Sequence, residues 1–207
     1  MKLYLSSYYL GDRPENFSEL FSENQSVAVI MNASDSNSPD DRPQYLEKNL
    51  AALELVGLRG EELDLTEYFE NTSLLRQKLN TFGGVWVVGG NSFVLRRAMR
   101  QSSFDKIAPE LIKRNELVYG GFSAGAIAAT PTLRGVEIVD DPLTVPKGYD
   151  KDIVWKGLNL YDKSIVPHYR SNHPESDKIE EVAMYFLSNN MPYIALQDGQ
   201  AITVKTP

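Results

Sequence analysis

The 207-residue sequence contains no cysteine and only two histidines, His168 and His173. The absence of cysteine excludes disulfide bonds, thiolate metal ligands and a cysteine nucleophile. Two histidines without cysteine provide few metal ligands, and carboxylates would have to supply the rest, so a metal-dependent hydrolase is disfavoured. We therefore expect neither a metal ion nor another cofactor.

The chain also has fewer basic residues than acidic ones. The chain carries 21 lysines and arginines against 28 aspartates and glutamates, which gives a formal net charge of −7. Such an acidic surface repels phosphate backbones and anionic lipids, so nucleic acids and membranes are disfavoured as partners. No apolar run approaches the ~18 residues of a membrane span, and the run at the start is too short for a signal peptide. We expect a cytoplasmic protein.

Short apolar runs alternate with amphipathic segments along the whole chain. Hydrophobic residues make up 42% of the sequence and charged residues 24%, as in ordinary globular proteins, and we expect a single domain over residues 1–207. Helices are predicted at residues 42–56, 92–99, 104–113 and 175–187. Strands are predicted at residues 2–6, 27–32, 61–65, 85–88, 117–120, 136–139, 164–166, 193–196 and 201–204.

Strands that alternate with helices predict an α/β fold in three layers, a mostly parallel sheet with helices on both faces. The runs at 27–31 and 85–88 are continuously apolar, as strands covered on both faces should be. Asp198-Gly199 separates the last two predicted strands, which favours a hairpin with a tight turn there.

The sharpest local motif is Gly-Phe-Ser-Ala-Gly at residues 121–125. It follows an apolar strand and precedes a predicted helix of small residues at 124–129. In the G-x-S-x-G pattern, a sharp strand-to-helix turn exposes the serine hydroxyl above the sheet edge, and flanking glycines avoid clashes. The pattern predicts Ser123 as a nucleophile.

A nucleophilic serine needs a base, and this chain offers two histidines. His168 follows the predicted strand 164–166, and the carboxyl ends of strands form the ligand crevice in open α/β sheets. His173 lies in a loop before a predicted helix, where an exposed loop histidine is the simpler interpretation. His168 is therefore the candidate base.

The third member of a triad is less well defined by the residues alone. If the chain order is serine, acid, histidine, then Glu137, Asp140 and Asp141 are all candidates. A glycine pair at 89–90 follows another strand. It lacks the phosphate-binding patterns of nucleotide sites and is better interpreted as part of an oxyanion hole.

Together these segments resemble the peptidase E family of aspartyl dipeptidase-like serine peptidases, to which cyanophycinase is related. The matching residues are 89–93, 121–126, 140–142 and 167–169, in the family's order across nearly the whole chain. The resemblance implies a flavodoxin- or class-I glutaminase-like fold. It also implies a serine exopeptidase of the dipeptidase type that cleaves short peptides without a metal ion.

The resemblance assigns roles to individual residues. It implies Ser123 as nucleophile, His168 as base and Asp140 as the acid, with Asp141 and Glu137 in reserve. The amides of Gly90 and Ala124 are implied as the oxyanion hole.

The family's aspartate specificity is expected to be absent. Aspartyl dipeptidases hold the substrate's aspartate partly through an arginine in the segment after the histidine. This segment contains Arg170 and Lys178 here, but Glu175 and Asp177 stand where the arginine is expected. Two carboxylates would repel an acidic side chain, so we expect no strict requirement for N-terminal aspartate.

Two alternatives remain from the sequence. The same residues would serve an esterase or amidase acting on small acyl compounds. A catalytically inactive binding member of the family is the other. A glutamine amidotransferase of related fold is excluded, because its nucleophile is a cysteine.

Overall fold

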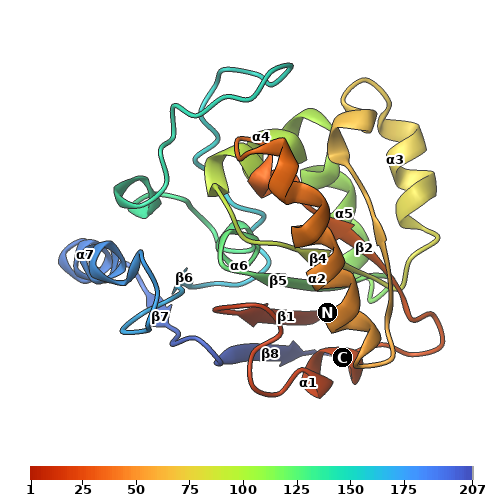
Figure 1. The fold of residues 1–207 in the computed structure, drawn as a ribbon, viewed down its shortest axis with the longest axis horizontal. Helices are drawn as coiled ribbons and strands as arrows, with labels where there is room; N and C mark the ends of the chain where they lie inside the picture. Colours follow the sequence, from red (N-terminus) through yellow and green to blue (C-terminus); the bar gives the residue numbers. More distant parts are fainter. Residues whose placement is uncertain (207) are drawn as a thin grey trace.

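A six-stranded sheet forms the centre of the molecule in the computed structural model, which describes residues 1–206 (Figure 1). The first five strands in its order are parallel, and the edge strand β8 runs antiparallel to β1. The order is β3 (Arg59–Glu62), β2 (Ser26–Ile30), β4 (Gly84–Val87), β5 (Val118–Phe122), β1 (Lys2–Ser6) and β8 (Ala201–Lys205).

Helices cover both faces of this sheet, so the predicted three-layer α/β architecture is confirmed. Side chains alternate along β1: Leu3 and Leu5 pack into the core on one face and Tyr4 into the core on the other. The first face is covered by α3 (Thr72–Leu79), α4 (Ser92–Gln101), α5 (Phe104–Lys113) and α6 (Ala124–Ala128). The second is covered by α1 (Glu15–Ser18) and α2 (Arg42–Glu54).

A second, two-stranded sheet lies beyond one end of the main sheet, at the left of Figure 1. Its strands β6 (Ser164–Val166) and β7 (Tyr193–Ala195) are parallel and joined through α7 (Ser176–Ser188). Val166 and one side of α7 share a small core of their own. The chain then passes from β7 into β8 of the main sheet, so the loop between them lies where the two sheets meet.

The structure corrects two of the predicted elements. Strands β7 and β8 do not form a hairpin, because β7 pairs with β6 and β8 pairs with β1. The predicted strand at 136–139 is instead a 3-10 helix, η4 (Val136–Ile138), which follows Gly135 in a left-handed conformation (φ 93°). Its apolar side chains contribute to cores beside α6 and α7 rather than to a sheet.

The sequence patterns also missed several short elements. Helices α1 and α3 were not predicted, and neither were the other 3-10 helices, η1 (Asn32–Ser34), η2 (Pro39–Asp41) and η3 (Leu65–Tyr68). Within residues 1–206, none of the helices combines the length and the apolar character that crossing a membrane would require.

Candidate active site

Ser123 occupies the sharp turn between β5 and α6 that its motif predicts. Its backbone has φ 49° and ψ −117°, a strained conformation for a residue with a side chain, of a kind that gathers at active sites. Its N–H donates to the carbonyl of Ser6 at 3.2 Å, which fixes the turn to the end of β1.

The glycines of the motif allow this turn to lie close against β4. A Cβ atom on Gly125 would lie 2.1 Å from the carbonyl oxygen of Val87, and one on Gly121 would lie 2.9 Å from the carbonyl carbon of Gly125. Both distances are too short for a side chain. The small residues therefore bring the first turn of α6 down onto the sheet and lift the Ser123 hydroxyl above it.

His168 lies just beyond the carboxyl end of β6 and reaches the serine. Its side chain is only 2% exposed, and its Nε2 lies 3.1 Å from Ser123 Oγ. Its backbone N–H donates to Ser7 Oγ at 2.7 Å. The structure thus brings together the serine and the histidine that the sequence paired.

The acid beside His168 is Asp198, in the loop between β7 and β8. Its Oδ1 lies 2.7 Å from His168 Nδ1, and a carboxylate there selects the tautomer that carries its proton on Nδ1. Ser7 donates to the same oxygen at 2.7 Å, and the N–H of Asp198 donates to Ser171 Oγ at 2.8 Å. Asp198 is therefore held from both sides.

The predicted choice of Asp140 as the acid is corrected by this geometry. Asp140 Oδ2 accepts a hydrogen bond of 2.8 Å from the N–H of Ser92, at the start of α4. Burial raises the pKa of Asp140 to about 6, and the charge of Glu175 adds to the rise. Asp140 shares a narrow recess with Ser123, but its carboxylate stabilises a helix N-terminus instead of orienting the imidazole.

The two reserve acids are also engaged locally. Asp141 accepts hydrogen bonds from Leu143 and Thr144 in its own turn. Glu137 accepts a hydrogen bond from the N–H of Gly135 at 2.6 Å. Both carboxylates stabilise the loop around η4.

The two amides assigned to the oxyanion hole flank the serine. Ala124 is the first residue of α6, where an N–H group has no partner within its helix. Gly90 has φ 141°, and a Cβ there would lie 2.4 Å from the carbonyl oxygen of Ala33, so only glycine fits. Gly90 and Ser123 both line this recess, and both also line a neighbouring cleft of about 170 Å³.

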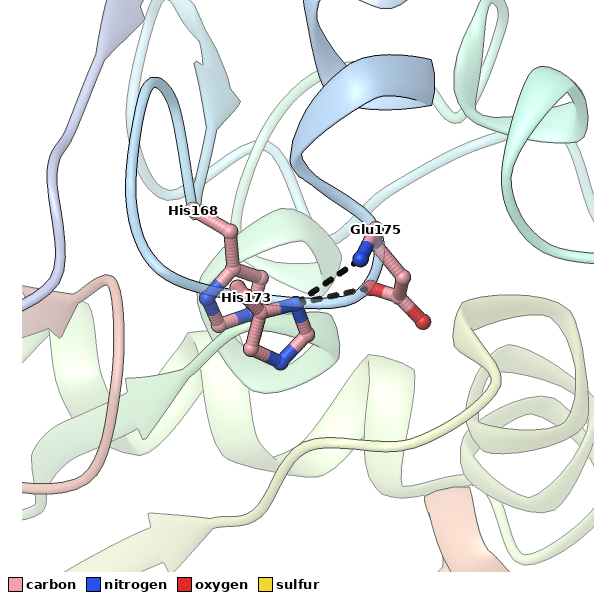
Figure 2. Close-up of side chains that lie close together, drawn as sticks. All are labelled: His168, His173 and Glu175. Atoms are coloured by element: carbon pink, nitrogen blue, oxygen red, sulfur yellow. Dashed lines mark hydrogen bonds and ion pairs between the residues drawn. The ribbon is translucent and has the colours of Figure 1, made fainter.

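His173 is not the exposed loop histidine that the sequence suggested. Its ring stacks on that of His168, with centroids 3.8 Å apart and planes 8° from parallel. Figure 2 shows the two rings overlapping, with Glu175 at the start of α7 beside them. His173 and Glu175 line the cleft of about 170 Å³ together with Gly90, Ser123 and His168.

The environment of His168 leads to a prediction about pH. Burial lowers the pKa of His168 and the neighbouring His173 lowers it further, and together they outweigh the opposing effects of Asp198 and Glu175. A base must be neutral to accept a proton, so kcat/KM should rise with pH with a midpoint below ~6.5, the ordinary histidine value. A rate profile between about pH 5 and pH 8 measures this midpoint.

The matched variant for this profile is His173→Gln. It removes the imidazole that lowers the pKa of His168 and part of the cover over His168, and both changes should move the midpoint upward. A flat profile, or a wild-type midpoint above the ordinary histidine value, would contradict the assignment of His168 as the base.

Sequence reasoning missed Asp198 and Ser7 as residues of this site, and it placed His173 in an exposed loop. Asp198 lies two residues after the predicted strand 193–196, which was the available signal, but the assumed chain order placed the acid before the histidine. Ser7 likewise follows β1, at the same sheet edge as Ser123. Only the pairing of β6 with β7 brings Asp198 to His168.

The chain is similar to a known protein family and to individual known proteins. The model of Peptidase family S51 matches residues 6–206. An uncharacterized peptidase of Listeria innocua is 32% identical over 168 residues, which cover 77% of this chain and 76% of that protein. One from Listeria monocytogenes is 29% identical over 161 residues, 78% of this chain and 74% of the relative.

Solved structures agree with these relatives. The crystal structure of a candidate peptidase E from Listeria monocytogenes has a TM-score of 0.72 at 26% identity and covers 100% of this chain and 98% of its own. A peptidase from an acI-B1 Actinobacterium shares the fold, with a TM-score of 0.69 at 14% identity over 99% of this chain and 83% of that one. The chain therefore belongs to peptidase family S51, the peptidase E family, and is a hydrolase of the peptidase class.

Proposed function

We propose that the protein is a serine exopeptidase that cleaves short peptides through Ser123, His168 and Asp198. The observation that carries this proposal is the continuous line of hydrogen bonds from Asp198 Oδ1 through both imidazole nitrogens to Ser123 Oγ. It has the connectivity of a catalytic triad, on a chain that belongs to a peptidase family.

The mechanism follows from the positions of these atoms. His168 Nε2 accepts the hydroxyl proton as Ser123 Oγ attacks the scissile carbonyl, and Asp198 stabilises the imidazolium that forms. The same proton then passes to the leaving amine. A water molecule, deprotonated by His168, attacks the acyl-enzyme and releases the second product.

The oxygen of the tetrahedral intermediate needs donors that are already in place. The N–H groups of Gly90 and Ala124 are proposed for this role. Neither N–H donates to a backbone carbonyl within residues 1–206. The positive end of α6 adds a smaller contribution of the same sign.

The charges around the cleft bear on which substrates it accepts. Glu175 lines both the cleft and the recess beside Ser123, and the half-buried Asp140 lines the recess. Arg170 instead pairs with Glu180 on the exposed side of α7, at 3.3 Å. These carboxylates would complement the α-ammonium group of a peptide and repel an acidic side chain.

The cleft also has room for a substrate beyond the scissile bond. Asn37 and Tyr45 border both the cleft and a neighbouring open hollow of about 400 Å³. A short peptide can therefore extend from the cleft into this hollow.

We predict that the enzyme has no strict requirement for N-terminal aspartate. A matched series of X-linked chromogenic amides, with X as Asp, Glu, Asn, Ala, Leu and Lys, measures this directly. Because Glu175 repels an acidic side chain, Asp should be cleaved no faster than the neutral residues. A lead of about a hundredfold for Asp, worth ~2.7 kcal/mol, would contradict the prediction.

Two controls make the series specific to the proposed contacts. Glu175→Gln should raise the rate for X as Asp relative to Ala, whereas Glu181→Gln, an exposed change on the same helix, should leave the ratio unchanged. An N-acetylated copy of the best substrate should be cleaved poorly, because it lacks the ammonium group. Efficient cleavage of that copy would argue against an exopeptidase.

A further inference from the structure

His168, His173 and Glu175 form a cluster whose donor atoms all lie within 4.8 Å of one another (Figure 2). We propose that this cluster binds a zinc-like divalent ion, and that the bound ion inhibits the enzyme by occupying the nitrogen of His168 that serves as the base. The inhibitory part rests on the proposed function; the binding part does not.

The donor set is the first argument. Two imidazole nitrogens and one carboxylate oxygen are a known three-ligand set for zinc, which then holds water in its fourth position. Bond lengths near 2.1 Å in a tetrahedral site place donor atoms roughly 3.4 Å apart. Rotation of the Glu175 and His173 side chains would shorten the present distances between donor atoms to that value. Both side chains have room to rotate, since Glu175 is 44% exposed and His173 is 22% exposed.

The two imidazoles are neighbours, and His168 already has the support that this role requires. The His168 and His173 rings lie nearly parallel with centroids 3.8 Å apart, so rotation of the half-buried His173 ring would turn its lone pair toward an ion on His168 Nε2. Asp198 holds His168 Nδ1 at 2.7 Å and leaves Nε2 as its metal-binding nitrogen. A carboxylate behind a ligating imidazole is the usual support of zinc-binding histidines, because it fixes the ring and makes it a better ligand.

The surrounding charge favours a cation. Glu175 lines the cleft and the recess, Asp140 lines the recess, and Asp198 lies behind His168. No lysine or arginine lines either cavity among the residues of the described chain, 1–206. The ion would therefore enter an acidic cleft without competition from a fixed positive charge.

Inhibition follows from the nitrogen that the ion takes. His168 Nε2 lies 3.1 Å from Ser123 Oγ and accepts its proton in the proposed mechanism. A metal ion bound there uses the same lone pair, so the serine loses its base. Zinc at this cluster is thus the opposite of a catalytic metal, and chelators should preserve or increase activity.

Imidazole NMR on the wild-type protein tests the binding directly. The chain has only two histidines, so a ¹H–¹⁵N spectrum of the rings contains two spin systems. After EDTA treatment and dialysis, titration with zinc should shift both in step and saturate at one ion per chain, whereas Mg²⁺, which prefers oxygen ligands, should shift neither. Unperturbed rings, or a shift confined to one histidine, would overturn the proposal.

Calorimetric titrations of variants identify the ligands. His173→Ala and Glu175→Gln should each weaken zinc binding at least tenfold, as expected when a ligand is lost, and Glu181→Gln should bind like the wild type. Unchanged affinity in both ligand variants would also overturn the proposal. Circular dichroism shows whether each variant is folded. If a variant is not folded, the imidazole NMR titration of the wild-type protein remains the test of the proposal.

The final arm separates this inference from the proposed function. Ser123→Ala should bind zinc as tightly as the wild type, because serine is not a ligand. Zinc should inhibit wild-type hydrolysis and EDTA should reverse it. Zinc binding without inhibition would overturn the inhibitory role, whereas full hydrolysis by Ser123→Ala would overturn the proposed function and leave the binding site intact.

Discussion

Replacing Ser123 with alanine is expected to lower kcat by about 10⁴-fold or more, the scale on which triad nucleophiles act. Alanine removes the attacking oxygen but preserves a backbone that already adopts φ 49° with a side chain present. The hydroxyl contacts His168 Nε2, and its loss leaves the core untouched. Turnover of the best chromogenic amide measures the effect.

Stability measurements keep this result interpretable. The melting temperature of Ser123→Ala should stay within a few degrees of the wild type, and Ser73→Ala, a change at an exposed serine of α3, should retain full activity. A folded Ser123→Ala enzyme that keeps more than about a tenth of wild-type turnover would contradict the role of nucleophile.

Replacing Asp198 with asparagine is expected to lower kcat by about 10³- to 10⁴-fold. The amide keeps the size of the side chain but cannot stabilise the imidazolium. It can also donate a hydrogen bond to His168 Nδ1, which favours the tautomer with its proton on Nε2, where it cannot accept from Ser123. The measurement is kcat on the same amide series.

Asp140→Asn is the matched control, because it makes the same chemical change at the acid that the sequence favoured. Asp140 bonds the start of α4 and lines the recess, so its replacement should alter KM more than kcat. A larger loss of kcat in Asp140→Asn than in Asp198→Asn would restore Asp140 as the triad acid and contradict the geometry.

The main sheet was largely predictable because its signals are local. The apolar runs of β2 and β4 are buried on both faces, between the two cores that flank the sheet. The apolar sequence of each of these strands therefore indicates, without any other segment, that the strand lies inside the sheet. The turn at Ser123 was predictable for the same reason, since the glycines that permit it lie beside it in the sequence.

The small sheet and the proposed triad acid were not predictable in this way. Strands β6 and β7 have three residues each and are separated in the sequence by α7. No local sequence pattern therefore predicts that they pair. Asp198 becomes a neighbour of His168 only through that pairing. The residues 136–139 mislead for a related reason, because a short alternation of apolar and acidic side chains suits a 3-10 helix packed on α7 as well as a strand.

The proposed specificity also depends on tertiary structure. The sequence placed Glu175 where the family's arginine is expected, but only the fold places it in the cleft with Ser123. The stacking of His173 on His168 is likewise a result of how the loop before α7 folds back over the site.

The central claim is that Ser123 is a nucleophile activated by His168, and labelling with a fluorophosphonate tests it most directly. Mass spectrometry of the digested protein should find one adduct per chain, on Ser123. Labelling should be absent in Ser123→Ala and strongly slowed in His168→Ala. A folded, hydrolytically active enzyme that forms no adduct, or that carries the adduct on a different residue, would contradict the account.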